Sequence, residues 1–267
     1  MSYRKHHIKS KIQKLKPKKR FYKKRGFWYT VLFLFIVFTI VYLFLLFEPI
    51  QIDNVSISGN KKVKTEDIKN IVLLNIDKNI SKSIFLADTQ VLQKEILDKY
   101  PQINYAKVSK KLFKTINVEV AEKIPVSVFC QAKVLPEGCY FLDQGGVIFE
   151  ALKDYAPDFS VIKKSQEEPD IFLGKKIFDK NVIDAVLKTK KILKENYNID
   201  IREALLVNPS QLNIRSSESW EVLLNLEADV NLQIVKLDLL LKNEISEKER
   251  RGLSYIDMRF KDRAYYK

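Results

Sequence analysis

Histidines occur only at the start of this sequence, which limits the chemistry that the rest of the chain can perform. His6 and His7 both lie within the first ten residues. The remaining sequence therefore lacks a Ser-His or Cys-His pair for nucleophilic catalysis, and it lacks the histidine ligands of most zinc sites. The two cysteines, Cys130 and Cys139, supply too few ligands for a metal site by themselves. We therefore predict neither a metal nor a cofactor.

Carboxylates are the remaining groups that can perform acid–base chemistry. Asp143 precedes Gly145 in a predicted turn, and Asp257 and Asp262 lie near the end of the chain. Two carboxylates held together can hydrolyse a glycosidic bond, whereas single ones serve turns and surface ion pairs. We predict the second role and keep a wall-modifying enzyme with a carboxylate pair as an alternative. A sensor that binds a small ligand is another alternative.

Cys130 and Cys139 lie on opposite arms of a predicted hairpin. The arms are residues 126–131 and 140–142, and the loop between them contains Pro136 and Gly138. A disulfide across the hairpin and two buried thiols are both compatible with this arrangement. The sequence leaves the two alternatives open.

An uncharged apolar run from Phe27 to Phe47 is long enough to cross a bilayer. As a helix it spans roughly 30 Å, the thickness of the hydrocarbon core. One alternative is a buried core helix, but such helices are rarely this long and this apolar. A cleaved signal peptide is another, but its apolar region is shorter than this run, and the run ends without the small residues of a cleavage site. We predict a transmembrane helix at residues 27–47.

The charge distribution predicts the orientation of this helix. Residues 1–26 contain twelve Lys and Arg and no Asp or Glu, so most of the net charge of +14 lies in this tail. Basic segments stay on the cytoplasmic side, which predicts a cytoplasmic tail at 1–26 and an exported part after it. The exported part is nearly neutral, which argues against a nucleic-acid-binding face. The tail itself can contact anionic lipid, and DNA or a cytosolic partner is the alternative for it.

The first exported unit, residues 48–124, has the predicted order β-α-α-β-β. A strand at 52–58 is followed by a helix capped by Thr65 with acidic residues in its first turn. A second helix opens at Asp88 or Thr89 and ends at Pro101. Two alternating strands follow at 105–109 and 116–121.

The second exported unit, residues 125–267, is predicted to be a mixed α/β domain built on a sheet. The predicted strands are 126–131, 140–142, 147–149, 203–207, 212–216 and 221–226, the predicted helices are 179–197 and 230–245, and residues 155–170 are predicted to form a surface loop. The chain closes with the segments 255–260 and 263–267. We therefore predict an α+β protein with a single membrane anchor.

Five segments in this order resemble the FtsQ/DivIB family of bacterial cell-division proteins, which carry a POTRA domain and a C-terminal β domain. They are 55–60 (VSISGN), 100–108 (YPQINYAKV), 118–125 (VEVAEKIP), 140–149 (YFLDQGGVIF) and 255–260 (YIDMRF). The resemblance implies a non-enzymatic protein of the cytoplasmic membrane at the division septum. It also implies FtsB-like and FtsL-like partners, through which the protein is linked to septal peptidoglycan synthesis.

The resemblance also implies that the partner-binding strand lies near the end of the second domain. We expect residues 263–267 to form the last strand of a sheet, with one edge left open because no later segment covers it. An open edge accepts a strand from a partner peptide. Tyr265 and Tyr266 then point to opposite faces of the sheet. The alternative is that both tyrosines complete the core. The candidate partner-binding residues are Tyr255, Arg259, Arg263, Tyr265 and Tyr266.

Overall fold

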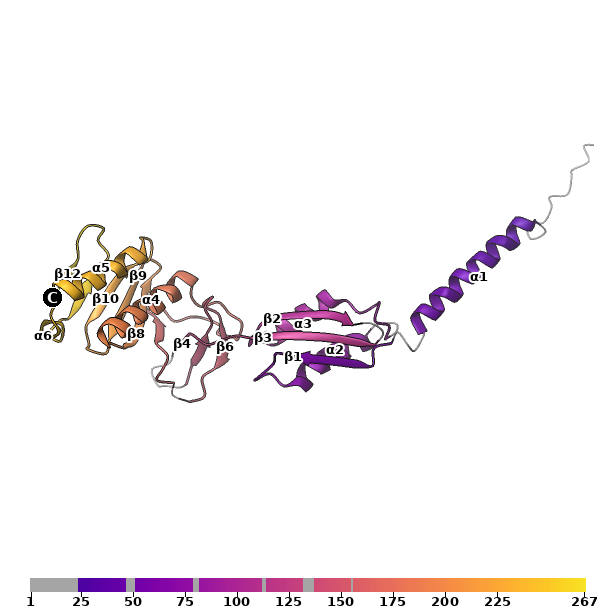
Figure 1. The fold of residues 1–267 in the computed structure, drawn as a ribbon, viewed down its shortest axis with the longest axis horizontal. Coiled ribbons are helices and arrows are strands. Elements are labelled where there is room, and N and C mark those ends of the chain that lie inside the picture. The colour runs from indigo at the N-terminus through magenta and orange to yellow at the C-terminus, as the bar shows by residue number, and fades with distance from the viewer. Residues whose placement is uncertain (1–23, 47–50, 79–81, 112–113, 132–136, 155) are drawn as a thin grey trace, which may run out of the picture.

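The computed structural model describes residues 24–46, 51–78, 82–111, 114–131, 137–154 and 156–267. It consists of an apolar N-terminal helix, a three-stranded sheet and a nine-stranded sheet that follow one another along the molecule (Figure 1). The predicted α+β class is therefore confirmed. The predicted tail at 1–26 lies almost entirely outside the described residues.

The first helix, α1 (Arg25–Leu46), has the properties of a membrane anchor. It is long and apolar enough to cross a bilayer, and its large apolar side chains, such as Phe33, Phe35 and Phe38, are exposed. A helix of a water-soluble domain buries one apolar face against a core, whereas α1 is apolar on all sides. Such a surface is consistent with a helix that lies in lipid.

The three-stranded sheet is built from the β-α-α-β-β order that was predicted. Its strands are β1 (Asn54–Ser58), β2 (Ile103–Lys111) and β3 (Thr115–Glu122), in the spatial order β1-β3-β2. β1 runs parallel to β3, and β2 runs antiparallel to it. Ile116, Val118 and Val120 of β3 alternate with exposed or half-buried residues and are buried with the apolar residues of two helices. This alternation is typical of a sheet covered on one face.

The covering helices are α2 (Thr65–Asp77) and α3 (Thr89–Lys99). Asp88 caps α3 by accepting hydrogen bonds from the backbone N–H of Gln90 and Val91, at 2.9 and 3.2 Å. The prediction that Thr65 caps α2 was wrong, because Lys64 occupies the N-cap position and its side chain makes no capping bond. The Thr65 hydroxyl instead accepts a hydrogen bond from the Asn60 side chain. This bond ties the start of α2 to the turn after β1.

Two ion pairs connect the first sheet to the second. Lys123 Nζ lies 2.7 Å from Asp143 Oδ2, and both side chains are largely buried. Lys62 Nζ lies 2.7 Å from Glu150 Oε2. Glu122 holds the segment that carries Lys62, because its carboxylate accepts the backbone N–H groups of residues 61–63. Burial alone raises the pKa of Glu122, but these N–H groups outweigh it and the pKa is lowered.

The nine-stranded sheet extends from this junction to the far end of the molecule. Its strands are β4 (Ser127–Cys130), β5 (Cys139–Leu142), β6 (Ile148–Ala151), β7 (Val161–Lys164), β8 (Ile201–Asn208), β9 (Gln211–Ser216), β10 (Glu221–Asn225), β11 (Tyr255–Asp257) and β12 (Tyr265–Tyr266). Their spatial order is β12-β11-β10-β9-β8-β7-β4-β5-β6. β6, next to the first sheet, and β12 are therefore the two edges.

β7 corrects the prediction that residues 155–170 form a surface loop. It pairs in parallel with β4 on one side and with β8 on the other. Ile162 is fully buried, whereas Lys163 and Lys164 are half-buried. Two apolar residues between proline-containing segments give no periodic signal, and the strand forms because β4 and β8 satisfy its backbone on both sides.

Two helices, α4 (Lys180–Tyr197) and α5 (Val230–Asn243), contribute to the main core of this sheet. Val182, Val186 and Leu193 of α4 and Leu237 and Leu241 of α5 are buried there. A smaller cluster of Val128, Cys130 and Cys139 lies apart from this core. β4 is therefore buried at every position, because successive side chains point to opposite faces.

A short helix that was not predicted, α6 (Glu247–Arg250), is held by a buried ion pair. Arg250 donates from Nε and Nη2 to the Glu218 carboxylate at 2.7 and 3.0 Å, and the two side chains are only 8% and 20% exposed. The indole N–H of the fully buried Trp220 donates to the same carboxylate at 3.0 Å. The guanidinium also lies over the ring of Tyr197, at 5.8 Å from its centroid. This cluster joins the β9–β10 turn to α4 and α6.

We expect the substitution Glu218→Gln to lower the free energy of unfolding by about 2–3 kcal/mol at neutral pH, because Arg250 loses its counter-charge. The hydrogen bonds from Arg250 lower the pKa of Glu218 below its ordinary value of 4.5 despite burial, and the Trp220 bond adds to this effect. The stabilisation is therefore complete above pH 4.5 and is lost as the pH falls through the lowered pKa. Urea unfolding of the detergent-solubilised protein should show the difference between wild type and variant shrinking in acid.

Glu247→Gln is the matched control, because Glu247 pairs with Arg251 in the same helix but both side chains are about two-thirds exposed. We expect a change below about 0.5 kcal/mol. An equal loss in the two variants contradicts a specific role for the buried pair.

Candidate partner-binding edge

β12 forms one open edge of the nine-stranded sheet. It pairs with β11 in antiparallel register, Ile256 opposite Tyr266 and Asp257 opposite Tyr265. Among the described residues, no strand pairs with its other side. An edge of this kind presents unpaired backbone groups to an incoming strand.

The hydrogen bonds to β11 show which backbone groups face outward. Lys267 donates its N–H to the Tyr255 carbonyl at 3.2 Å, and the Tyr255 N–H donates back at 3.3 Å. Neighbouring residues of an antiparallel strand point their backbone groups to opposite sides. The N–H and C=O of Tyr266 therefore point away from β11, toward the open edge.

The side chains of β12 are exposed on both faces. Tyr265 and Tyr266 are 45% and 50% exposed, so the alternative that both complete the core is not what the structure shows. The Tyr265 ring contacts the ring of Phe260 edge-to-face at 5.1 Å. Its hydroxyl accepts a hydrogen bond from Arg263 at 3.3 Å. Phe260, Arg263 and Tyr265 thus form one exposed group beside the edge.

Arg259 and Tyr255, the other candidates, lie further inside. Arg259 donates from Nε and Nη2 to the Asp257 carboxylate at 2.8 and 2.5 Å, and from Nη1 to Gln211 at 3.1 Å. Burial alone raises the pKa of Asp257, but the hydrogen bonds from Arg259 outweigh it and the pKa is lowered. Tyr255 is half-buried in β11. Arg259 thus positions the segment that follows β11, and a direct contact of Arg259 or Tyr255 with a partner stays a prediction.

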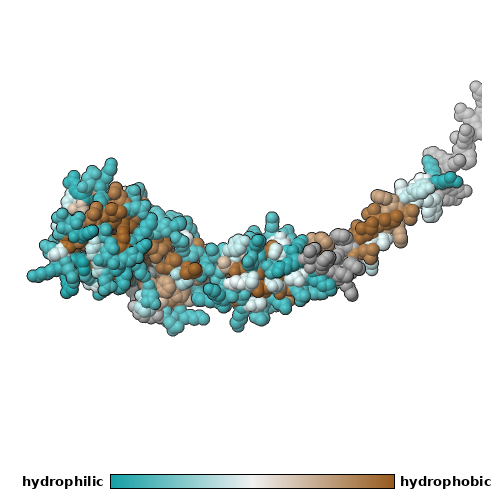
Figure 2. Space-filling model, in the orientation of Figure 1, coloured by the Kyte–Doolittle hydropathy of each residue, from teal (hydrophilic) through white to brown (hydrophobic). Residues whose placement is uncertain are grey.

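The exposed face of α5 adds residues that the sequence analysis did not select. Leu232, Val235 and Leu239 are about half exposed, on the side of α5 opposite its buried stripe. A groove of about 390 Å³ separates Leu232 from Phe260. Figure 2 shows hydrophobic residues gathered over the end of the molecule where Figure 1 places α5 and β10. The signal was present in the sequence, because the spacing i, i+3, i+7 occurs twice on this helix.

Two of the carboxylates considered for catalysis, Asp143 and Asp257, lie far apart in the sheet. Asp143 lies in the turn after β5, where its Oδ1 accepts the N–H of Gly145 and Val147 and its Oδ2 pairs with Lys123. Asp257 is bound by Arg259 near the opposite edge of the sheet, and Asp262 is exposed. In the described part of the chain, no three His, Cys, Asp or Glu side chains are grouped closely enough to hold a metal ion.

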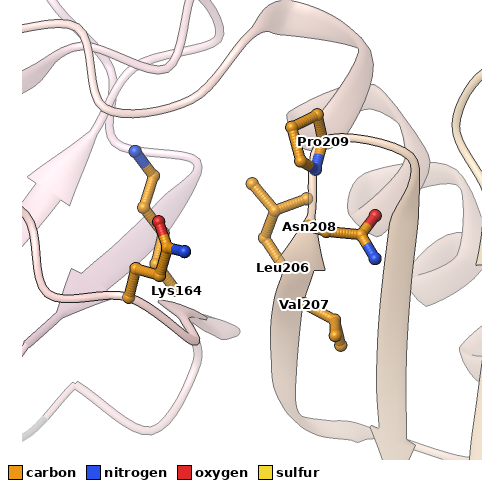
Figure 3. A pocket seen from close by; sticks show the side chains of 6 residues that line it. Lys164, Leu206, Val207, Asn208 and Pro209 are labelled. Carbon is orange, nitrogen blue, oxygen red and sulfur yellow. The ribbon is translucent and has the colours of Figure 1, made fainter.

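A small cavity lies between the ends of β7 and β8. Figure 3 shows Lys164 on one side and Leu206, Val207, Asn208 and Pro209 on the other. Its volume is about 180 Å³, whereas pockets for small molecules usually enclose about 300–1,000 Å³. The cavity therefore gives no specific support to the alternative of a ligand-binding sensor.

Cys130 and Cys139 face each other across β4 and β5, and the structure joins them by a disulfide. Their Cα atoms are 4.2 Å apart. The neighbouring Gln131 N–H donates to the Gly138 carbonyl, which makes the cysteines a pair without hydrogen bonds between their own backbones. Side chains lie closest in such pairs, which favours a bridge over two thiols.

We expect the protein purified without reductant to show no free thiol after denaturation. Reduction should lower the free energy of unfolding by about 2–3 kcal/mol, because the closed loop is short. The double variant Cys130→Ala/Cys139→Ala should not respond to reductant. Labelling of both cysteines in the unreduced protein would show that the bridge is absent.

Comparison with protein families gives two matches in chain order. The model of the POTRA domain, FtsQ-type, matches residues 50–123, and the model of the cell division protein FtsQ/DivIB C-terminal domain matches residues 134–259. Together they cover most of the chain after α1, and each corresponds to one of the two sheets. No curated protein sequence matches significantly.

Proposed function

Because this chain belongs to the FtsQ/DivIB family of bacterial cell-division proteins, we propose that it is a non-enzymatic scaffold whose β12 edge binds an extended segment of an FtsB-like partner. The family consists of division proteins without enzymatic activity, and it implies a scaffold role in cell division. The outward-facing backbone of Tyr266 is the observation on which the partner site rests.

Strand addition is the binding mode that this edge supports. An incoming peptide forms main-chain hydrogen bonds with the N–H and C=O of Tyr266, and the exposed tyrosine rings contact its side chains. The groove between Leu232 and Phe260 offers apolar surface for residues of the same partner. The partner is an FtsB-like protein, together with an FtsL-like protein, and through them the scaffold is linked to septal peptidoglycan synthesis.

The location that we propose is the cytoplasmic membrane at the division septum. The tail at 1–26 lies in the cytoplasm, α1 spans the membrane and residues 48–267 lie outside. The strongly basic composition of the tail is the observation that supports this orientation.

We expect protease added to intact spheroplasts to digest the part after α1 and to spare an epitope placed in the tail, because the membrane protects only the cytoplasmic side. Lysed spheroplasts provide the control, in which both parts are digested. Digestion of the tail alone in intact spheroplasts contradicts the orientation.

Tyr266→Pro tests the partner site directly. Proline removes the N–H that points to the open edge, and it removes no ladder bond to β11, so it is tolerated at this edge position. We expect the Kd for the FtsB-like partner to rise about tenfold or more, because the partner's carbonyl is left without a donor. The thermal midpoint should stay within a few degrees of wild type. Isothermal titration and thermal unfolding of the same samples measure both.

Lys267→Pro is the matched comparison, because the Lys267 N–H donates to β11. We expect this variant to lose stability by about 1 kcal/mol together with binding. Tyr266→Ala then separates the ring from the backbone. Unchanged binding in Tyr266→Pro, or a fall in stability equal to that of Lys267→Pro, shows that the open edge is not the site.

A further inference from the structure

The end of the first domain that follows α1 must lie close to the membrane surface. α1 ends at Leu46, and Gln51 already pairs with Ser83 while the Ile52 N–H donates to the Lys82 carbonyl at 2.9 Å. Five residue steps span at most about 17 Å when fully extended. The headgroup layer extends several ångströms beyond the hydrocarbon core that α1 crosses. The chain length therefore keeps this end of the domain within reach of the headgroups, whichever way α1 is oriented.

The same end carries exposed apolar side chains on a turn. Residues 84–86 form the turn between α2 and α3, and in it Ile84 is buried whereas Phe85 and Leu86 are 57% and 41% exposed. Two large apolar side chains at the tip of a turn are costly in water and favourable at the boundary of the acyl chains.

Exposed lysines lie at the same end of the domain as this turn. Lys78 follows the end of α2, and Lys110 and Lys111 end β2; all three are exposed. Lys110 Nζ donates to the Phe85 carbonyl at 3.2 Å, which places the end of β2 beside the turn. Ion pairs of Lys82 with Asp77 and of Lys114 with Asp53 neutralise two further lysines, but within the described ranges no ion pair neutralises Lys78, Lys110 or Lys111.

We propose that this surface, formed by Lys78, Phe85, Leu86, Lys110 and Lys111 and here called the membrane-proximal patch, docks on the headgroups of anionic lipids. The lysines bind the lipid phosphates, and Phe85 and Leu86 enter the boundary between headgroups and acyl chains. This second attachment holds the first domain in a defined orientation on the membrane, which a single helix followed by a short linker does not do. The proposal goes beyond the scaffold function and does not depend on the partner edge.

The test uses the full chain in nanodiscs, with an environment-sensitive fluorophore on Leu86→Cys. One set of discs contains phosphatidylcholine with about one-third phosphatidylglycerol, and the other contains phosphatidylcholine alone. We expect a blue-shifted emission in the anionic discs, quenched by a spin label carried near the lipid headgroup. The matched site is Glu195→Cys, at an exposed position of α4 far from the membrane, and its probe should report water in both discs.

Charge variants separate lipid binding from protein contacts. Lys78→Gln/Lys110→Gln/Lys111→Gln should lower the ratio of docked to free domain on the order of a hundredfold in anionic discs. Lys69→Gln/Lys94→Gln/Lys99→Gln removes the same charge from exposed positions of α2 and α3 outside the patch and should leave that ratio unchanged. A probe at residue 86 that reports water in anionic discs overturns the proposal. A blue-shifted probe that the spin-labelled lipid does not quench assigns the patch to a protein contact and overturns the proposal. A blue shift that appears only with two copies of the protein per disc does the same.

Discussion

The parallel pairing of β7 with β4 and β8 joins the two halves of the nine-stranded sheet. On one side lie β4, β5 and β6, whose Glu150 contacts the first domain through Lys62. On the other side lie β8 to β12, which end in the open edge. Without the backbone hydrogen bonds of β7, these halves have no common sheet, because no other strand bridges them in the described structure. The position of the open edge relative to the first domain therefore depends on a strand of four residues.

The two edges of the sheet have different surroundings, and this difference explains why only one of them is a binding site in our proposal. β6 lies at the junction, where Glu150 is paired and the nearby Lys123 and Asp143 are largely buried. Among the described residues, nothing pairs with the outer side of β12, and its tyrosines are exposed beside the apolar face of α5. A free edge strand normally promotes aggregation. Proteins limit this risk by keeping edge strands short and by placing charged side chains beside them. β12 has two residues and is flanked by Arg263 and Lys267.

The partly or largely buried ion pairs at the end of the second domain orient segments that connect helices and strands. They do not lie in the centre of the apolar core. Glu218 and Arg250 connect a turn to α6, and Asp257 and Arg259 set the path of the chain from β11 toward β12. Each pair is partly or largely buried and is supported by further hydrogen bonds, which is the condition for a buried charge to be tolerated. Apolar clusters supply the stability, whereas these pairs set the geometry of the end of the domain that carries the partner edge.

The sequence by itself determined the features that depend on the pattern of residues within a short segment of the chain. The anchor followed from the uncharged run, and the helices α2, α3, α4 and α5 followed from apolar spacing near 3.6 residues. The membership in the FtsQ/DivIB family followed from short segments in a fixed order. The predicted hairpin indicated that Cys130 and Cys139 lie near each other. The choice between a disulfide and two thiols needed the register of β4 and β5, which places the two residues directly opposite each other.

Only the tertiary structure decided the features that depend on neighbours distant in the chain. β7 has no periodic pattern, and it becomes a strand because β4 and β8 complete its hydrogen bonds. The tyrosines of β12 were selected from the sequence, yet the outward direction of the Tyr266 backbone depends on the register with β11. Leu232 and Leu237 are equally apolar in the sequence, and only the packing of α5 against the sheet buries one and exposes the other. Composition and spacing indicate which helix or strand a residue forms. Its burial and the direction of its backbone hydrogen bonds depend on the neighbouring elements against which that helix or strand packs.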